Sequence, residues 1–120
     1  MKKYELVNPQ KVNDLILYQV KALRDFAYVK TGDLGGWIEK EHNLSHEGDC
    51  WVYDDATVSG NARVFDNAKV YGNAIVYGNA RVSGNAEVFD NARVIGNALV
   101  SGNARVFDNA LVSGDTKISK

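Results

Sequence analysis

The 120-residue chain has little of several residue types, with one cysteine, one proline and two histidines. A single cysteine excludes an internal disulfide framework and a cysteine-rich zinc site, as is usual in a reducing compartment. The formal net charge is only −1, so charge alone predicts no attraction to nucleic acid or to an anionic membrane. The first residues lack the apolar core of a signal peptide, and no apolar run reaches the ~18 residues of a membrane span. We therefore expect a soluble, cytoplasmic protein of one-domain size.

A six-residue repeat with the pattern V-x-[G/D]-N-A-x fills most of the chain. Its valine recurs every six residues from Val52 to Val112, and Ile118 opens a last, shortened repeat. No insertion interrupts the series from about residue 43 onward. Uninterrupted short periodicity is typical of a solenoid, in which each repeat packs only on its neighbours.

Each repeat predicts a short strand followed by a tight turn. Alternation places Ala62 and Val64 on one side of the chain and Arg63 and Phe65 on the other. The Gly/Asp-Asn pair that follows consists of residue types that tolerate positive φ and form turns. Three repeats, or 18 residues, would close one triangular coil, whose strands stack ~4.8 Å from those of the next. Valine would then fill the middle of each wall, and alanine would leave room at each corner.

The V-x-G-N-A-x pattern resembles the hexapeptide repeat of left-handed β-helix proteins, a family that includes many acyltransferases. The resemblance alone implies the left-handed sense, since left-handed crossovers between parallel strands are rare. The expected fold class is all-β: a single-stranded left-handed parallel β-helix, or hexapeptide-repeat solenoid, of about four coils. We expect a β-hairpin-like, β-rich N-terminal cap over residues 1–40 and the β-helix over residues 41–120.

The segment that precedes the regular repeats carries a second resemblance. Residues 19–53 include Gly35-Gly36-Trp37 and Asn43-Leu44-Ser45, and they resemble the start of the YdcK-like hexapeptide-repeat proteins. These are bacterial and prophage proteins that are labelled transferases on the basis of their fold. The resemblance implies a prophage-encoded protein with a transferase-like fold, although fold does not determine activity.

The first forty residues predict a cap that covers the end of the solenoid. Residues 4–7 and 15–23 are rich in β-branched and aromatic residues, and they predict two strands. The polar segment Asn8-Pro9-Gln10 predicts the turn between them. A cap is needed because the terminal coil would otherwise expose unpaired strand edges.

Sorting the outward residues by 18 predicts three walls of different character. The first begins with Trp51 and continues as an aromatic ladder, the second is largely aliphatic, and the third is basic and rich in serine. Exposed apolar ladders on a small protein indicate an interface, and the β-helix resemblance implies a homotrimer. Alternatively, stacked aromatic residues only stabilise neighbouring coils. The expected interface residues are Tyr53, Tyr71, Phe89 and Phe107 on the first wall and Ile75, Tyr77, Ile95 and Leu111 on the second.

Candidate catalytic residues occur only at the irregular start of the repeats. They are His42, His46 and Cys50, which could form a Cys/His pair or part of a metal site. Two histidines fall short of the three that a zinc carbonic anhydrase of this fold uses, and Cys50 fits a corner that alanine occupies in later repeats. The residues therefore favour a protein that is not an enzyme and that uses no metal or cofactor.

Four arginines are candidate contacts for an anionic ligand. Arg63 and Arg81 share one column of the third wall, while Arg93 and Arg105 lie on the other walls. They could bind a small anion such as a nucleotide in clefts between protomers. The balanced charge and sparse aromatic interleaving argue against nucleic acid as the partner.

Three functions remain open at this point. The favoured one is a non-enzymatic homotrimeric β-helix scaffold or binding module, with the host-interaction role that the prophage resemblance implies. The second is a binder that sequesters an anionic small molecule at protomer interfaces. The third is an acyltransferase-like enzyme, or a degenerate remnant of one, with His42 or His46 as the base.

Overall fold

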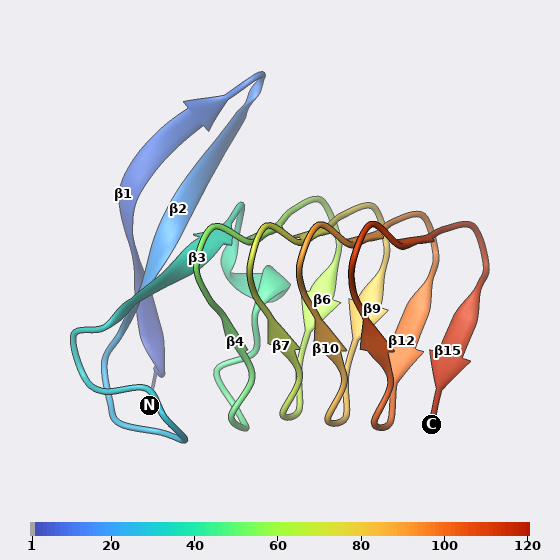
Figure 1. The fold of residues 1–120 in the computed structure, drawn as a ribbon. Helices are drawn as coiled ribbons and strands as arrows, with labels where there is room; N and C mark the ends of the chain where they lie inside the picture. The colour runs from blue at the N-terminus through green and yellow to red at the C-terminus, as the bar shows by residue number, and fades with distance from the viewer. Residues whose placement is uncertain (1) are drawn as a thin grey trace.

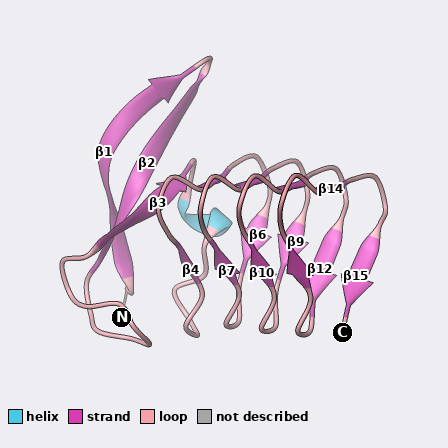
Figure 2. Ribbon diagram, viewed as in Figure 1, coloured by secondary structure: helices cyan, strands magenta, loops and turns pink. Residues whose placement is uncertain are grey.

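The computed structural model of the protein describes residues 2–120 as a prism of short strands with a hairpin at its N-terminal end (Figure 1). The chain begins with β1 (Tyr4–Val12), β2 (Leu15–Ala22), β3 (Leu34–Ile38) and the 3-10 turn η1 (Glu41–Asn43). Strands make up nearly all the remaining regular structure (Figure 2). They are β4 (Trp51–Val52), β5 (Thr57–Val58), β6 (Arg63–Val64), β7 (Lys69–Val70), β8 (Ile75–Val76), β9 (Arg81–Val82), β10 (Glu87–Val88), β11 (Arg93–Val94), β12 (Leu99–Ser101), β13 (Arg105–Val106), β14 (Leu111–Val112) and β15 (Lys117–Ser119).

Parallel strands 18 residues apart pair to form the three walls of the prism. The aromatic wall consists of β4, β7, β10 and β13; the aliphatic wall of β5, β8, β11 and β14; and the basic wall of β6, β9, β12 and β15. Each pairing keeps the same register, for example Glu87 opposite Lys69 and opposite Arg105. The predicted fold class is confirmed: an all-β, single-stranded parallel β-helix with a β-rich cap.

The solenoid begins earlier in the chain than the repeat suggested. β3 pairs in parallel with β5, and Leu44 bridges Val64 on the basic wall, so β3, Leu44 and β4 together form a first coil. The sheet that contains β3 has five solenoid strands, β3, β5, β8, β11 and β14, which gives about five turns rather than four. This first coil could not be predicted from the repeat, because the sequence of β3 (Leu34–Ile38) does not follow the V-x-[G/D]-N-A-x pattern.

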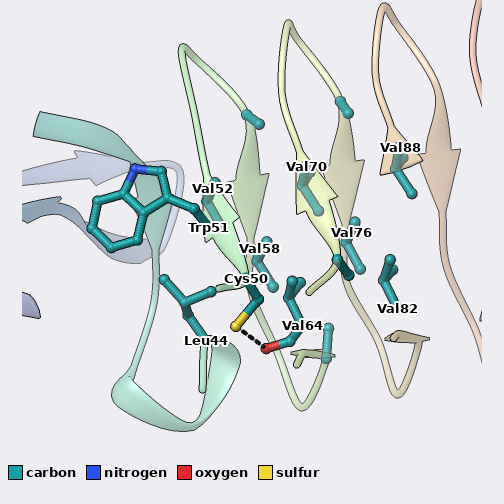
Figure 3. Packing of buried hydrophobic residues seen from close by; sticks show 14 of the residues in the cluster. Leu44, Cys50, Trp51, Val52, Val58, Val64, Val70, Val76, Val82 and Val88 are labelled. Carbon is teal, nitrogen blue, oxygen red and sulfur yellow. Dashed lines mark hydrogen bonds between the residues drawn. The ribbon is translucent and has the colours of Figure 1, made fainter. Parts of the chain in front are cut away.

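The interior is a stack of valine and alanine side chains. The repeat valines Val52 to Val100 and the alanines Ala56 to Ala104 are fully buried, and Figure 3 shows the valines aligned one behind another along the prism. At about 25 cal/mol per Å² of buried apolar surface, this continuous column supplies the main driving force for stacking the coils. Valine in the walls and alanine at the corners are thus confirmed.

The turns depend on the residue before asparagine. Asp54, Asp66, Asp90 and Asp108 all have φ between 57° and 59°. Three of these carboxylates also bond to the next coil: Asp54 Oδ2 accepts from the Gly72 amide at 3.0 Å, Asp66 Oδ2 from the Gly84 amide at 3.0 Å, and Asp90 Oδ2 from the Asp108 amide at 3.1 Å. These aspartates therefore shape the turns and join them to the neighbouring coils.

The hairpin β1–β2 differs from the expected one in the position of its turn. Asn8-Pro9 forms a bulge within β1, where the register shifts between Val7 and Gln10. The chain reverses at Asn13-Asp14 instead, and Asn13 has the positive φ of 56° that a tight turn needs. The prediction of a turn at Asn8-Pro9-Gln10 was wrong because a bulge uses the same residue types as a turn.

The antiparallel hairpin joins the aliphatic wall through β3, and its tip stands clear of the prism (Figure 1). Val12, Leu15 and Ile16 near this tip are exposed. No helix among residues 2–120 is long and apolar enough to cross a membrane.

Candidate functional site

The junction between the cap and the regular coils brings together the two histidines and the cysteine. A buried asparagine, Asn43, organises this irregular segment. Its Oδ1 accepts from the amides of Glu39 (3.1 Å) and Lys40 (2.9 Å), and its Nδ2 donates to the carbonyls of Gly60 (3.2 Å) and Ala62 (2.8 Å). One side chain thus ties η1 to the next coil and fixes where the flanking histidines lie.

His46 is held by the first residues of the chain. Its ring stacks on Tyr4 with centroids 4.1 Å apart, and its Nδ1 accepts the Lys3 amide at 3.1 Å. Nε2 lies 3.5 Å from Glu41 Oε1. Desolvation lowers the pKa of His46, although the Glu41 carboxylate opposes the shift. His46 is therefore a neutral ring built into the attachment of the cap.

Cys50 is fully buried at the corner that alanine occupies in later repeats, with its Sγ 3.6 Å from the Val64 carbonyl (Figure 3). Burial raises the pKa of the thiol above its ordinary value. A nucleophilic cysteine needs an accessible thiolate, and this one has neither access nor a lowered pKa. The geometry gives Cys50 a packing role.

Lys3 is a buried cation that sequence reasoning missed. Its side chain is 0% exposed, and its Nζ donates to the carbonyls of Cys50 (2.6 Å) and Gly48 (3.2 Å) and lies 3.4 Å from Cys50 Sγ. Burial lowers the pKa of Lys3. The sequence carried no signal for this contact, because its partners lie more than 40 residues further along the chain.

A cleft of about 490 Å³ opens beside the junction. Both histidines line it together with Glu41 and Arg63. Desolvation lowers the pKa of His42, and the positive charges of Lys40 and Arg63 lower it further. Both imidazoles are therefore neutral near pH 7, the form in which histidine can accept a proton.

The aromatic ladder forms as the 18-residue spacing requires. The rings of Tyr71 and Phe89 stack at 4.9 Å, those of Phe89 and Phe107 stack at 5.4 Å, and those of Tyr53 and Tyr71 meet edge to face at 6.3 Å. Trp51, expected at the outer face of this wall, is buried instead. The cap covers it, and Phe26 meets its ring edge to face at 5.1 Å.

The candidate interface residues differ in how far they are exposed. Tyr77 and Leu111 on the aliphatic wall are 43% and 60% exposed, and Phe107 on the aromatic wall is 45% exposed. Tyr53, Tyr71, Phe89, Ile75 and Ile95 are half-buried by neighbouring coils. The largest uncovered apolar groups of the two walls are therefore at Leu111, Phe107 and Tyr77.

The four candidate arginines are not brought together. Arg63 lies opposite Arg81 on the basic wall, whereas Arg93 belongs to the aliphatic wall and Arg105 to the aromatic wall. Within one chain they cannot form a single anion site. Among residues 2–120, no group of three or more histidine, cysteine, aspartate or glutamate side chains is arranged to hold a metal ion.

The fold and its six-residue repeats define a β-solenoid protein. Residues 62–78, 68–84, 76–88 and 98–114 match the family described as the YdcK β-solenoid repeat. The chain is also similar to the uncharacterized acetyltransferase YdcK of Escherichia coli (strain K12), with 36% identity over 51% of this chain. The resemblance to YdcK-like hexapeptide-repeat proteins is thereby confirmed. The match spans only 24% of that relative's length.

Proposed function

We propose that the protein is a non-enzymatic, homotrimeric β-solenoid scaffold or binding module that associates through its aliphatic wall. One observation carries the proposal: Leu111 and Tyr77 are exposed on a flat wall and have no partner ring beside them, unlike the stacked residues of the aromatic wall. Apolar patches of this kind on a small protein mark interaction sites.

The hairpin supports the same surface. Val12 and Leu15 lie opposite each other at its tip, and both are exposed. A cleft of about 380 Å³ lies between the hairpin and the aliphatic wall, lined by Val12, Leu17 and Trp37 among others. In a trimer the prism of a neighbouring subunit would fill the space between the hairpin and the aliphatic wall, and it would bury the apolar residues of both. The remaining walls would face a partner, which for a prophage-type protein would be a host protein.

The junction supports a non-enzymatic role. Cys50 is a buried thiol, and His46 uses one ring face and Nδ1 to hold the cap. Two of the three candidate catalytic residues therefore have structural duties.

A double variant on the aliphatic wall and a single leucine variant on the basic wall test the trimer. We expect the wild-type protein to sediment at three times its 13.2-kDa chain mass and the double variant Leu111→Ser/Tyr77→Ser to sediment as a monomer. Leu99→Ser is the control, because Leu99 occupies the same place in its repeat but on the basic wall. Analytical ultracentrifugation at micromolar concentration measures all three proteins, and a monomeric wild type would refute the proposal.

A second candidate is acetyl transfer, favoured by one observation. The junction cleft places the neutral imidazole of His42 beside the Arg63 cation, and the similar YdcK protein is named an acetyltransferase. His42 would accept the proton of the amine or hydroxyl group as that group attacks the thioester carbonyl of acetyl-CoA, and the coenzyme A thiolate would leave. This candidate predicts that acetyl-CoA raises the melting temperature and that His42→Ala abolishes acetyl transfer while leaving the fold intact. If acetyl-CoA causes no thermal shift, the candidate fails.

A further inference from the structure

A cleft at the N-terminal end of the aromatic wall is lined by three tyrosines among six residues. It has a volume of about 280 Å³, and the cap and three strands of the solenoid surround it. Its lining residues are Tyr28, Tyr53, Asp54, Lys69, Tyr71 and Glu87. Tyr53 and Tyr71 meet at 85°, so their rings form two sides of a corner, and Tyr28 of the cap borders the same space.

Tyr28 is presented to this cleft by a firmly anchored loop. The amide and carbonyl groups of Phe26 and Val29 bond to each other at 2.9 and 2.7 Å, which closes a two-residue turn. Both flanking side chains are buried, whereas Tyr28 at the tip is 87% exposed. Ala27 takes a positive φ of 46°, an unusual conformation for a residue other than glycine. The cap thus holds a large aromatic ring outward for no packing reason of its own.

The cleft already attracts a cation. The ammonium group of Lys69 lies 5.8 Å from the centre of the Tyr28 ring, within the range of a cation–π interaction. Two carboxylates, Asp54 and Glu87, share the cleft with this single ammonium group. Glu87 Oε1 accepts the Tyr71 hydroxyl at 2.9 Å.

The surroundings favour positive charge. Burial raises the pKa of Tyr71 to about 12, and the Glu87 carboxylate adds to that shift. Burial also raises the pKa of Tyr53, with further contributions from Asp49 and Asp54. The carboxylates of Glu87, Asp49 and Asp54, which contribute to these shifts, would also favour a bound cation.

We propose that this cleft is a binding site for an organic cation of the quaternary ammonium class, held against the rings of Tyr28, Tyr53 and Tyr71. The ligand would displace Lys69 from Tyr28. The site lies on the aromatic wall of a single chain, so it is separate from the proposed trimer surface and goes beyond the scaffold function.

A quaternary group fits better than a metal ion or a primary amine. The Glu87 carboxylate already accepts from Tyr71, and Asp54 already accepts from the Gly72 amide. One oxygen of each carboxylate remains free, which is fewer than the roughly six to eight oxygen ligands that a calcium ion takes, and the three tyrosine ring faces offer no acceptor oxygens to the N–H donors of a primary amine. A trimethylammonium group has no donors and gains from contact with aromatic faces.

The test compares choline with its neutral isostere, 3,3-dimethylbutan-1-ol, by NMR of the tyrosine ring protons. We expect choline to cause saturable shifts, and the neutral alcohol to cause shifts at least about fivefold weaker at equal concentration. Equal responses to the two probes would overturn the proposal, because shape rather than charge would then be recognised. The absence of a saturable response to choline would overturn it as well.

Matched tyrosine variants locate the site. Tyr28→Ala is expected to weaken choline binding about fivefold, and Tyr28→Phe less than twofold, because the aromatic face is retained. Phe65→Ala is the control, since Phe65 is a half-buried aromatic residue on the basic wall, outside both this cleft and the proposed trimer surface. Lys69→Met is expected to tighten binding by removing the internal competitor. Unchanged binding in Tyr28→Ala would refute the site, and retained binding in a monomeric Leu111→Ser/Tyr77→Ser protein would separate it from the trimer.

Discussion

Gly35→Ala is expected to destabilise the fold by about 3 kcal/mol or more, enough to unfold a marginally stable domain of this size. A Cβ on Gly35 would overlap the Val52 carbonyl oxygen and lie 2.7 Å from Val20 Cγ2 and 2.8 Å from Trp51 Nε1. At this point β3 lies against both β2 of the hairpin and β4 of the aromatic wall. The obstacle includes main chain, so no side-chain rotation can relieve it.

The control for this variant is Gly114→Ala. Gly114 has a positive φ of 62°, but a Cβ there would meet nothing within 4 Å. Alanine should therefore cost only the ~1 kcal/mol of a left-handed conformation. Chemical denaturation measures both changes. Equal losses would mean that the close approach at Gly35 does not limit the fold.

The repeat could be read from sequence because each of its residues acts locally. Valine, alanine and the Gly/Asp-Asn turn serve neighbouring coils in the same way, so their spacing of six residues fixes the register of all three walls. Register and burial from β5 onward follow this rule, for example Arg93 opposite Ile75 and opposite Leu111. A local pattern is enough where the structure repeats.

The cap could not be read in this way, since its contacts join distant parts of the chain. Trp51 occupies an outward position in the repeat, yet Phe26 and Tyr4 cover it. Lys3 meets Cys50, 47 residues away, and Tyr4 donates its hydroxyl to the Leu44 carbonyl. Alternation along a strand specifies which side a residue faces, but not whether a distant segment will cover that side.

The candidate sites follow the same division. The sequence indicated an irregular junction over residues 43–53, and the structure places His42 and His46 in one cleft beside it. The sequence could not show that the Lys3 amide binds His46 Nδ1 and that Tyr4 stacks on the His46 ring. Nor could it show that Tyr28 lines the same cleft as Tyr53 and Tyr71. Cap residues complete both the histidine junction and the tyrosine cleft. Because the cap sequence does not repeat, its contacts could not be predicted from the six-residue spacing.

Lys3→Ala is expected to cost about 3 kcal/mol of unfolding free energy and to loosen the cap. The substitution removes the donor for the Cys50 and Gly48 carbonyls and leaves a hole beneath Phe26, whose ring centre lies 4.9 Å from Lys3 Nζ. Lys2→Ala is the matched control. Lys2 is an exposed neighbour whose ion pair with Glu41 (2.8 Å) is worth little in water. Urea denaturation gives the free energies, and hydrogen exchange in β1 and β2 reports the cap.

The dependence of stability on pH distinguishes the charge of Lys3 from its bulk. Because burial lowers the pKa of Lys3 below 10.5, the unfolded chain binds this proton more tightly than the folded chain. The folded state therefore gains stability from this group as the pH rises toward 10.5. Lys3→Met keeps most of the side-chain volume but cannot titrate, so the stability advantage of the wild type over Lys3→Met should grow between neutral pH and pH 10. A constant difference would mean that Lys3 has the same pKa in the folded and the unfolded chain, and it would contradict this prediction. A growing difference would show that burial penalises the Lys3 ammonium group, so that the fold gains stability when this group loses its proton.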